Sequence, residues 1–318
     1  MGYGRYDHEA HVALTESRSG KAAAEVFVAQ ACDPALSPWQ VVRQSRDSAD
    51  HPDSVPIVIA LDVSGSMGVI PHELATRTLP TFMKIVMTVL PDPQVLFIAF
   101  GNVFGDRSPL QVGQFESSAE LIDKWLALAH LEGGGGGLGE SYDLAMYFAA
   151  RHTATDAWEK RQRKGYFFMT GDEVPFVWVA PHTVAKTMGD TLAANIPIHE
   201  MTAELQARYH TFFLIPDATR AAQYECGVVW RRLLHERAIV LGAPSDTALV
   251  AALCVGIEER RLVTVDDVAR FAHDTLGLDG DLHARVVGAV TPFAEALQRG
   301  PIAAPLPLGI GKDPGLKG

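Results

Sequence analysis

The sequence predicts an α/β protein with a mostly parallel, doubly wound sheet. Short and nearly continuous apolar runs, typical of strands buried on both faces, lie at 55–63, 95–100, 166–170, 211–215 and 238–241. Segments with helical periodicity separate these runs along the chain. Because such an alternation places helices on both faces of a sheet, most of the strands should be parallel.

The elements follow in a regular order. The run at 55–63 leads through Ser64-Gly65-Ser66-Met67-Gly68 into a helical pattern over 71–90, which Pro80 should kink or split. After the strand at 95–100 we expect a short strand at 110–115 and a helix at 119–130. The glycine loop 133–137 and a helix at 141–152 come next. Helices at 200–209 and 221–234 precede the last two strands.

Composition changes along the chain suggest four parts. We interpret residues 1–53 as a polar N-terminal extension and 54–245 as the main α/β domain. Residues 246–299 form a helical appendage in which Thr264 is a candidate N-cap, and the Gly- and Pro-rich residues 300–318 form a flexible tail. His8-Glu9-Ala10-His11 is one residue short of a zinc-protease helix motif and is interpreted as a surface feature.

Charge and cysteine content limit the possible functions. With 27 basic and 38 acidic residues, the chain of 318 residues has a net charge of −11, which disfavours binding to nucleic acid. Cys32, Cys226 and Cys254 are too few and too scattered for a disulfide framework, and indicate a reducing compartment. No secretory signal is visible, and the longest apolar run, 248–257, is about half of a membrane span. We therefore expect a cytoplasmic protein that does not bind membranes.

Oxygen-bearing side chains gather where the predicted strands end. Asp62, Ser64 and Ser66 follow the first strand at alternate positions, and Asp172 follows the strand at 166–170. In open parallel sheets the carboxyl ends of the strands form the ligand-binding edge. One carboxylate and two hydroxyls suit a hard cation such as Mg²⁺. An Asx-turn with a helix cap would explain the same residues without a metal.

Asp62-x-Ser64-x-Ser66 resembles the metal-binding motif of the von Willebrand factor A (vWA) family, including its position after a buried strand. The resemblance covers residues 54–245 and extends to bacterial stand-alone vWA proteins that share a glycine-run loop. It implies a doubly wound, Rossmann-like fold with one antiparallel edge strand and a metal-ion-dependent adhesion site. The implied cofactor is Mg²⁺, with Mn²⁺ or Ca²⁺ as alternatives. Ser64 and Ser66 would bind it directly, and Asp62 directly or through water.

The sequence departs from the family pattern in two loops. The second loop normally supplies a Thr, which residues 133–139 lack, so Glu140 and Ser141 are the nearest oxygen donors. The third loop normally reads Thr-Asp-Gly, whereas this chain has Thr170-Gly171-Asp172-Glu173. We select Asp172 as the ligand and keep Glu173 as the alternative.

The predicted function is a non-catalytic, metal-dependent protein-interaction module. In this prediction, an Asp or Glu carboxylate of a protein partner completes the coordination of Mg²⁺. The resemblance adds a role as adaptor for an AAA+ ATPase of the MoxR type. No catalytic residue is assigned. Two alternatives stay open: a metal-dependent phosphoester hydrolase that uses Asp62, Asp172, Glu140 and Glu173, and a structural subunit with a vestigial metal site.

Overall fold

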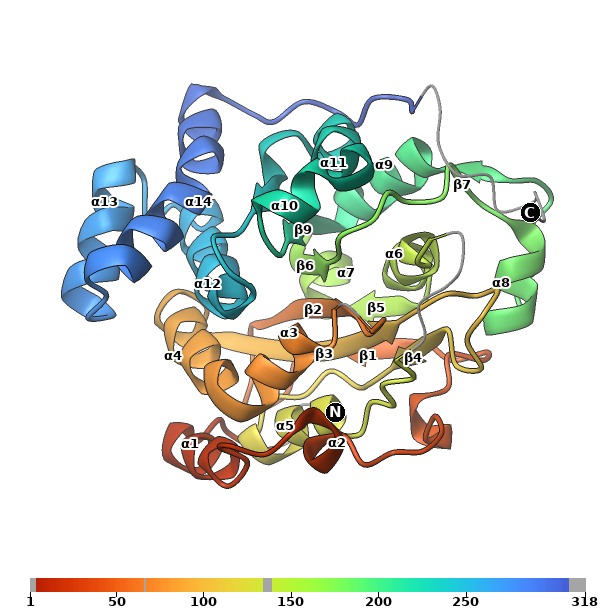
Figure 1. Cartoon of the computed structure of the whole chain (residues 1–318), viewed down its shortest axis with the longest axis horizontal. Helices are drawn as coiled ribbons and strands as arrows, with labels where there is room; N and C mark the ends of the chain where they lie inside the picture. The colour runs from red at the N-terminus through yellow and green to blue at the C-terminus, as the bar shows by residue number, and fades with distance from the viewer. Residues whose placement is uncertain (1–3, 66, 134–138, 309–318) are drawn as a thin grey trace.

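A computed structural model describes residues 4–65, 67–133 and 139–308, except for the side chain of Tyr224, and it shows an α/β fold built on a six-stranded sheet (Figure 1). In spatial order the strands are β10 (Ala238–Val240), β9 (Tyr209–Ile215), β6 (Gly165–Thr170), β2 (Ser54–Asp62), β3 (Asp92–Phe100) and β4 (Leu110–Val112). All neighbouring pairs are parallel except β3 and β4. The predicted mostly parallel sheet is therefore confirmed.

β2 lies at the centre of this sheet, and all nine of its residues are buried. It pairs with β3 along its whole length and with β6 from Ile57 onward. Pro56, which has no N–H to donate, lies just before the β6 ladder begins, so the ladder loses no hydrogen bond there. The later strands are added on both sides of β2, so the chain changes direction across the sheet beside it.

Consecutive strand residues pack into two different cores. Ile57, Ile59 and Phe168 belong to one core cluster, whereas Val58 and Phe167 belong to the other. Because successive side chains of a strand point to opposite faces, the sheet is buried on both sides. This explains the nearly continuous apolar runs of the sequence.

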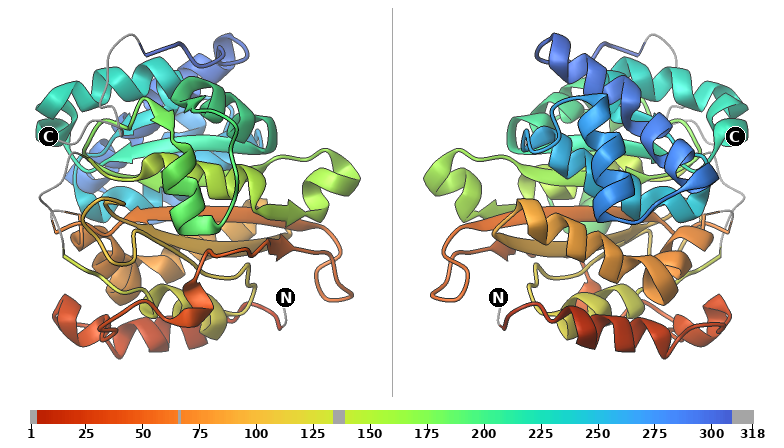
Figure 2. Two further views of the ribbon diagram at one scale, coloured as in Figure 1. Left: turned by 90° about the vertical axis from the view of Figure 1, so that its right-hand side faces the viewer. Right: turned by 90° about the vertical axis from the view of Figure 1, so that its left-hand side faces the viewer.

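The helices cover both faces of the sheet, as the two side views show (Figure 2). The α-helices are α1 (His8–Glu16), α2 (Ala23–Val26), α3 (Val69–Glu73), α4 (Leu79–Val89), α5 (Ala119–Ala127), α6 (Tyr142–Arg151), α7 (Asp156–Arg161), α8 (Pro181–Met188), α9 (Ile198–Arg208), α10 (Ala218–Ala222), α11 (Cys226–Leu234), α12 (Thr247–Glu258), α13 (Val265–Arg270) and α14 (Gly280–Arg299). Short 3₁₀ segments are η1 (Pro34–Leu36), η3 (Gln223–Glu225), η4 (His235–Arg237) and η5 (Pro244–Asp246), and η2 (Leu74–Thr78) and η6 (Phe271–Thr275) are π-helical. Two further pairs of short strands are β1 (Arg43–Ser45) with β5 (Thr153–Thr155), and β7 (Trp178–Val179) with β8 (Ile196–Pro197).

The helical pattern predicted over 71–90 is divided in the structure. Helix α3 passes into the π-helical η2, and α4 then begins with Pro80 at its first turn. At this position the missing N–H of proline costs no helical hydrogen bond. The split was predicted from Pro80, but the π-helical turn before it was not.

The N-terminal residues lie against the main sheet and its helices. β1 pairs in parallel with β5, and Arg18, just after α1, forms a two-pronged ion pair with Asp123 of α5. His11 is completely buried and its Nδ1 lies 2.8 Å from the hydroxyl of Tyr6. The interpretation of the His8–His11 segment as a surface feature is therefore wrong for His11.

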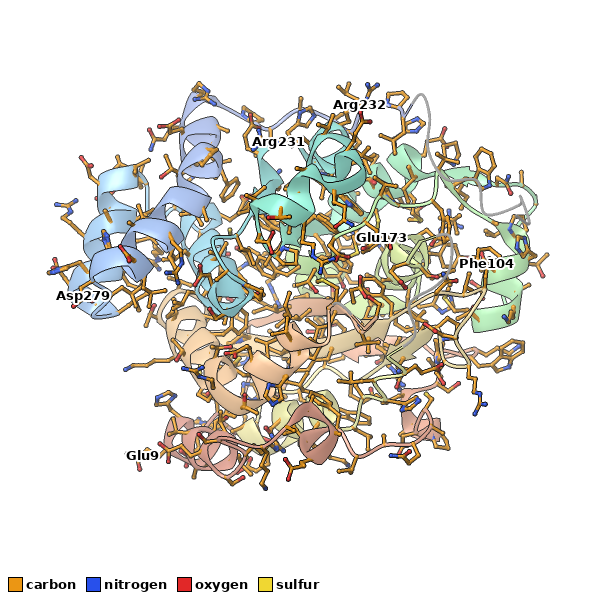
Figure 3. The ribbon with its side chains drawn as sticks, viewed as in Figure 1. Glu9, Phe104, Glu173, Arg231, Arg232 and Asp279 are labelled. Carbon is orange, nitrogen blue, oxygen red and sulfur yellow. The ribbon has the colours of Figure 1, made fainter. Side chains whose placement is uncertain are left out.

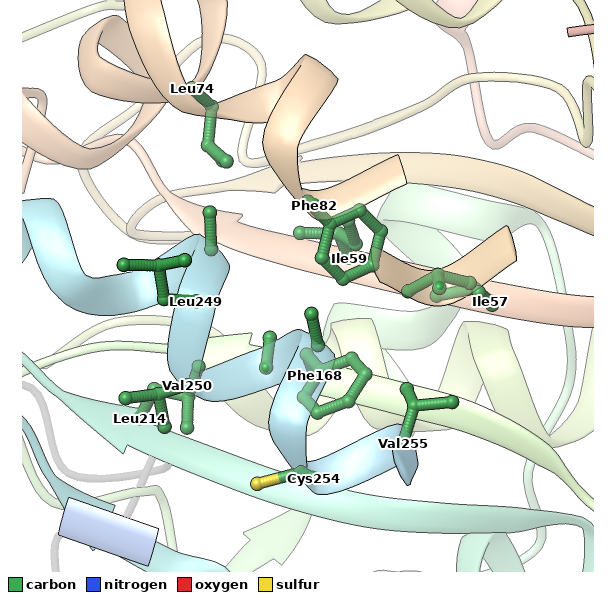
Figure 4. Packing of buried hydrophobic residues seen from close by; sticks show 14 of the residues in the cluster. Ile57, Ile59, Leu74, Phe82, Phe168, Leu214, Leu249, Val250, Cys254 and Val255 are labelled. Atoms are coloured by element: carbon green, nitrogen blue, oxygen red, sulfur yellow. The ribbon is translucent and has the colours of Figure 1, made fainter. Parts of the chain in front are cut away.

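Helix α12, the first helix of the predicted appendage 246–299, packs directly on the sheet. Leu249, Val250 and Cys254 lie in the same core as Ile59 and Phe168 (Figure 4). Further along, Thr264 accepts a hydrogen bond from the N–H of Asp267, which confirms the predicted N-cap of α13. Within the described residues, no helix combines the length and the apolar composition needed to span a membrane.

Candidate metal centre

Asp62 is the last residue of β2 and is completely buried. Its Oδ1 accepts the Ser64 N–H at 2.9 Å, and its Oδ2 accepts the hydroxyl of Tyr142 at 3.2 Å. Burial raises the pKa of Asp62 to about 7, although hydrogen bonds from Ser64 favour the ionised form. The Asx-turn proposed for Asp62 and Ser64 is therefore present, and it presents a carboxylate at the edge of the sheet.

Several carboxyl groups approach one another at this edge. Burial and the charges of Asp62, Glu173, Asp106 and Asp172 raise the pKa of Glu140 to about 8. We call these five residues, Glu140 included, the carboxylate cluster. They come from the end of β2, from the loops that follow β3 and β6, and from the loop before α6.

Glu140 contains an unusual oxygen. The residue is 5% exposed, and its Oε2 is buried with no hydrogen-bond partner among the described atoms. A buried polar atom without a partner is destabilising unless an unseen ligand satisfies it. Carboxylate oxygens are ligands that Mg²⁺ prefers, so a divalent cation is one ligand that would satisfy this atom.

Asp172, the chosen ligand of the third loop, is buried in the same cluster. Its Oδ2 accepts a hydrogen bond from Nη1 of Arg220 at 2.9 Å, so its charge is partly balanced within the chain. Arg220 belongs to α10, and the sequence contained no motif that linked this helix to the site.

Ser64 and Ser141 have different surroundings. Ser64 is buried beside Asp62, whereas the Oγ of Ser141 accepts the Val103 N–H at 2.9 Å and so fixes the loop after β3. Of the two replacements considered for the missing Thr, Glu140 therefore has the freer oxygen. Ser66 and residues 134–138 of the glycine loop lie outside the described residues. Gly133, at the start of that loop, lies against Gly65, since a Cβ added to Gly65 would be 3.1 Å from the Gly133 oxygen.

Tyr142 connects the first and third loops. It is fully buried, and its hydroxyl donates to Asp62 and accepts the backbone N–H of Glu173 at 3.2 Å. The Glu173 carbonyl in turn accepts the indole N–H of Trp230 at 2.9 Å. Glu173, the alternative ligand, is half-buried, and its backbone N–H and carbonyl both form hydrogen bonds to side chains; Figure 3 labels its position.

The order Thr-Gly-Asp has a steric reason. A Cβ at Gly171 would lie 2.4 Å from the hydroxyl oxygen of Tyr142, which is far inside van der Waals contact. A side chain directly after Thr170 would therefore displace Tyr142, and the carboxylate occurs one residue later, at Asp172.

Sequence reasoning missed Tyr142, Arg220 and Asp106. Asp106 accepts the Asn102 N–H at 2.7 Å, and a Cβ at Gly101 would collide with its carboxylate. Tyr142 could have been suspected, because it directly follows Ser141 and begins the buried helix α6. The positions of Asp106 and Arg220 depend on loop paths that no spacing rule gives.

The described residues contain no group of three or more His, Cys, Asp or Glu side chains with a geometry that could hold a metal ion. The expected donor set includes three acids, Asp62, Glu140 and Asp172, which the described structure does not bring into such a geometry, together with the hydroxyls of Ser64 and of Ser66, which lies outside the described residues. The metal centre therefore stays a proposal, which the unsatisfied oxygen of Glu140 supports.

Comparisons with known proteins give no family for this chain: no family model and no curated protein matches it. Among solved structures it is similar to proximal thread matrix protein 1 from the mussel byssus, with 11% identity over 68% of this chain and 48% of that chain and a TM-score of 0.40. It is also similar to the pilus adhesin SpaC from Lactobacillus rhamnosus GG in its open conformation, with 11% identity over 69% of this chain and 31% of that chain and a TM-score of 0.41. A second structure of SpaC gives 12% identity, 69% and 31% coverage and a TM-score of 0.42. The chain thus spans about half of the mussel protein and under a third of the adhesin, and likenesses at this level carry no argument about function.

Proposed function

We propose that this chain is a non-catalytic, divalent-metal-dependent protein-interaction module of the vWA type. The observation that carries the proposal is the buried Glu140 Oε2, which has no described hydrogen-bond partner and lies close enough to Asp62 for the charge of that carboxylate to raise the pKa of Glu140. Such an arrangement is costly for a metal-free chain and becomes favourable when a cation is shared.

The residues that would hold the ion come from three loops at one edge of the sheet. Asp62, Ser64 and Ser66 would act from the first loop, Glu140 from the second and Asp172 from the third. Bound Mg²⁺ would supply a local positive charge and an open coordination position for a partner's Asp or Glu carboxylate. Tyr142 keeps the first and third loops at a fixed separation, because its hydroxyl bonds to both.

The partner and setting belong to the same proposal. A carboxylate-bearing protein surface is the ligand that such a centre recognises, and an AAA+ ATPase of the MoxR type is the partner that the vWA resemblance suggests. Association with a cytoplasmic assembly, without nucleic acid or membrane, agrees with the net charge of −11.

The test is a calorimetric titration of Mg²⁺ and Mn²⁺ into the metal-stripped chain. We expect one binding site in the native sequence, and loss of binding in Asp62→Ala and in Asp62→Asn, whose amide oxygen still accepts the Ser64 N–H. Asp279→Ala is the matched control: it removes an exposed carboxylate at the start of α14, well away from Glu173 in Figure 3.

Two results would replace this proposal. If neither ion binds the native chain, the metal centre is absent and the chain is a structural subunit. If the loaded chain hydrolyses phosphoesters and Asp62→Asn abolishes the turnover, the chain is a hydrolase.

A further inference from the structure

Arg220 forms an ion pair with Asp172, which is one of the ligands in the proposed metal centre. Its Nη1 lies 2.9 Å from Oδ2 of Asp172, whose side chain is 5% exposed, whereas the Arg220 side chain is 38% exposed. A charge-assisted hydrogen bond of this kind, to a nearly buried acid, is among the stronger polar contacts in proteins. The guanidinium therefore stabilises Asp172 in the conformation that the structure shows.

The helix that carries Arg220 is weakly attached. None of the five residues of α10 is buried, and the helix is only five residues long. Its N-terminus is fixed by Asp217, whose Oδ1 accepts the Arg220 N–H at 2.9 Å. Moving α10 would therefore expose little apolar surface, and short exposed segments of this kind have low local stability.

The acidic surroundings of Asp172 favour a positive charge beside it, whether that charge is a guanidinium group or a metal ion. The charge of Asp172 acts on both Asp62 and Glu140 in the carboxylate cluster, so neutralising Asp172 relieves repulsion across the whole cluster. A guanidinium group can provide this neutralisation when no metal is bound. The positive charge of Arg220 beside Oδ2 also repels a metal ion at Asp172, so this ion pair lowers the affinity of the carboxylate for a cation.

We propose that Arg220 is an internal competitor of the metal: its guanidinium neutralises Asp172 in the metal-free chain, and its positive charge weakens metal binding at this carboxylate for as long as the two stay paired. This inference rests on the proposed function, because it assumes a metal centre at this edge of the sheet. It adds regulation to that centre, since anything that moves α10 changes the affinity for the ion.

The test compares Mn²⁺ affinities, measured by calorimetry on the full chain. Arg220→Met keeps the length of the side chain and removes its charge, so the dissociation constant should fall about tenfold, which corresponds to about 1.4 kcal/mol. Arg231→Met is the matched control, because it removes the same charge from an exposed position on the neighbouring α11. It should leave the affinity within about twofold, as its charge is screened by solvent.

A second variant moves Arg220 without changing it. Asp217→Ala removes the side-chain cap of α10, which weakens the hold of the helix on Arg220, and should tighten Mn²⁺ binding about threefold. Loss of a negative charge alone would weaken the binding of a cation. Tighter binding in this variant can therefore be assigned to the release of Arg220.

The outcomes separate this inference from the proposed function. Unchanged or weaker binding in both Arg220→Met and Asp217→Ala, with binding still lost in Asp62→Asn, overturns the competition and leaves the metal centre in place. Absence of binding in every variant overturns both. Binding to the native chain that Asp62→Asn abolishes, and that becomes tighter in both Arg220→Met and Asp217→Ala, supports both.

Discussion

Gly171 determines how the third loop meets Tyr142, and replacing it gives a direct measure of that contact. Gly171→Ala should lower the free energy of unfolding by about 2–3 kcal/mol, because the added Cβ would lie 2.4 Å from the Tyr142 hydroxyl and 2.5 Å from its ring. The strain would fall on the hydroxyl that bonds to Asp62 and to Glu173. Urea denaturation, followed by the fluorescence of the Trp residues, measures the loss.

Gly68 provides the control for this substitution. It lies in the first loop region, just before α3, and a Cβ added there meets nothing within 4 Å. Gly68→Ala should therefore change the free energy of unfolding by less than about 0.5 kcal/mol. Equal effects of the two substitutions would show that Tyr142 moves easily and does not fix the spacing of the loops.

The sequence predicts individual site residues only where they follow a strand. Asp62 and Asp172 could be placed because the apolar runs before them determine where the strands end. Tyr142 and Arg220 reach the same site from helices, and their contacts depend on how those helices pack. A pattern of residue types along the chain does not contain that information, so these two residues were not predicted.

Glu258, a nearly buried acid, joins helix α12 to the sheet, and its contribution to the stability of the chain should depend on pH. Glu258 is 5% exposed and pairs with Arg237 and with His210, whose Nδ1 lies 3.2 Å from Oε2. Burial raises the pKa of Glu258, but hydrogen bonds and charge from His210 and Arg237 outweigh it and lower the pKa to about 2. The unfolded chain therefore binds this proton more readily than the folded chain does.

The sign of the pH effect follows from this shift. The contribution of Glu258 to stability should be complete above its ordinary pKa of 4.5 and should disappear as the pH falls toward 2. After allowance for the partly exposed partners, Glu258→Gln should lower the free energy of unfolding at pH 7 by about 2 kcal/mol. The difference from the native chain should shrink steadily below pH 4.5. Denaturant titrations between pH 3 and 7 measure it.

An exposed glutamate, Glu295, provides the control for the loss of a negative charge in Glu258→Gln. Glu295 is 52% exposed and lies 3.9 Å from Arg299 on α14. Glu295→Gln should change stability by less than about 0.5 kcal/mol at every pH. A Glu258→Gln difference that is equally independent of pH would contradict the assigned pKa.

Strands buried on both faces could be predicted from the sequence, whereas the π-helical turns could not. The five strand runs named from the sequence correspond to β2, β3, β6, β9 and β10, because continuous burial leaves a continuous apolar run. The π-helical turns η2 and η6 have no such signal. A π turn depends on local packing against neighbouring helices, so the sequence predicted ordinary helix there.

At the scale of the whole molecule, we expect the N-terminal residues to unfold together with the sheet. Arg18 gives the means to test this, because its Nη2 lies 2.7 Å from Oδ2 of Asp123 on α5. The Asp123 side chain is 5% exposed and that of Arg18 is 18% exposed, so the pair is mostly removed from water. Taking away the arginine would leave a carboxylate buried without its counter-ion, which is strongly unfavourable.

Arg18→Met should therefore lower the free energy of unfolding by about 2 kcal/mol in a single transition. A single transition is expected because α1 contacts both α4 and α5, which belong to the core of the sheet. Arg77→Met is the matched control: its side chain is 70% exposed and lies 3.8 Å from Glu73, so its removal should cost less than about 0.5 kcal/mol. Calorimetry would contradict the argument if Arg18→Met produced a separate early transition and left the main one unchanged. The N-terminal residues would then be a detachable layer, and their burial of Asp123 would contribute nothing to the stability of the sheet or of the carboxylate cluster at its edge.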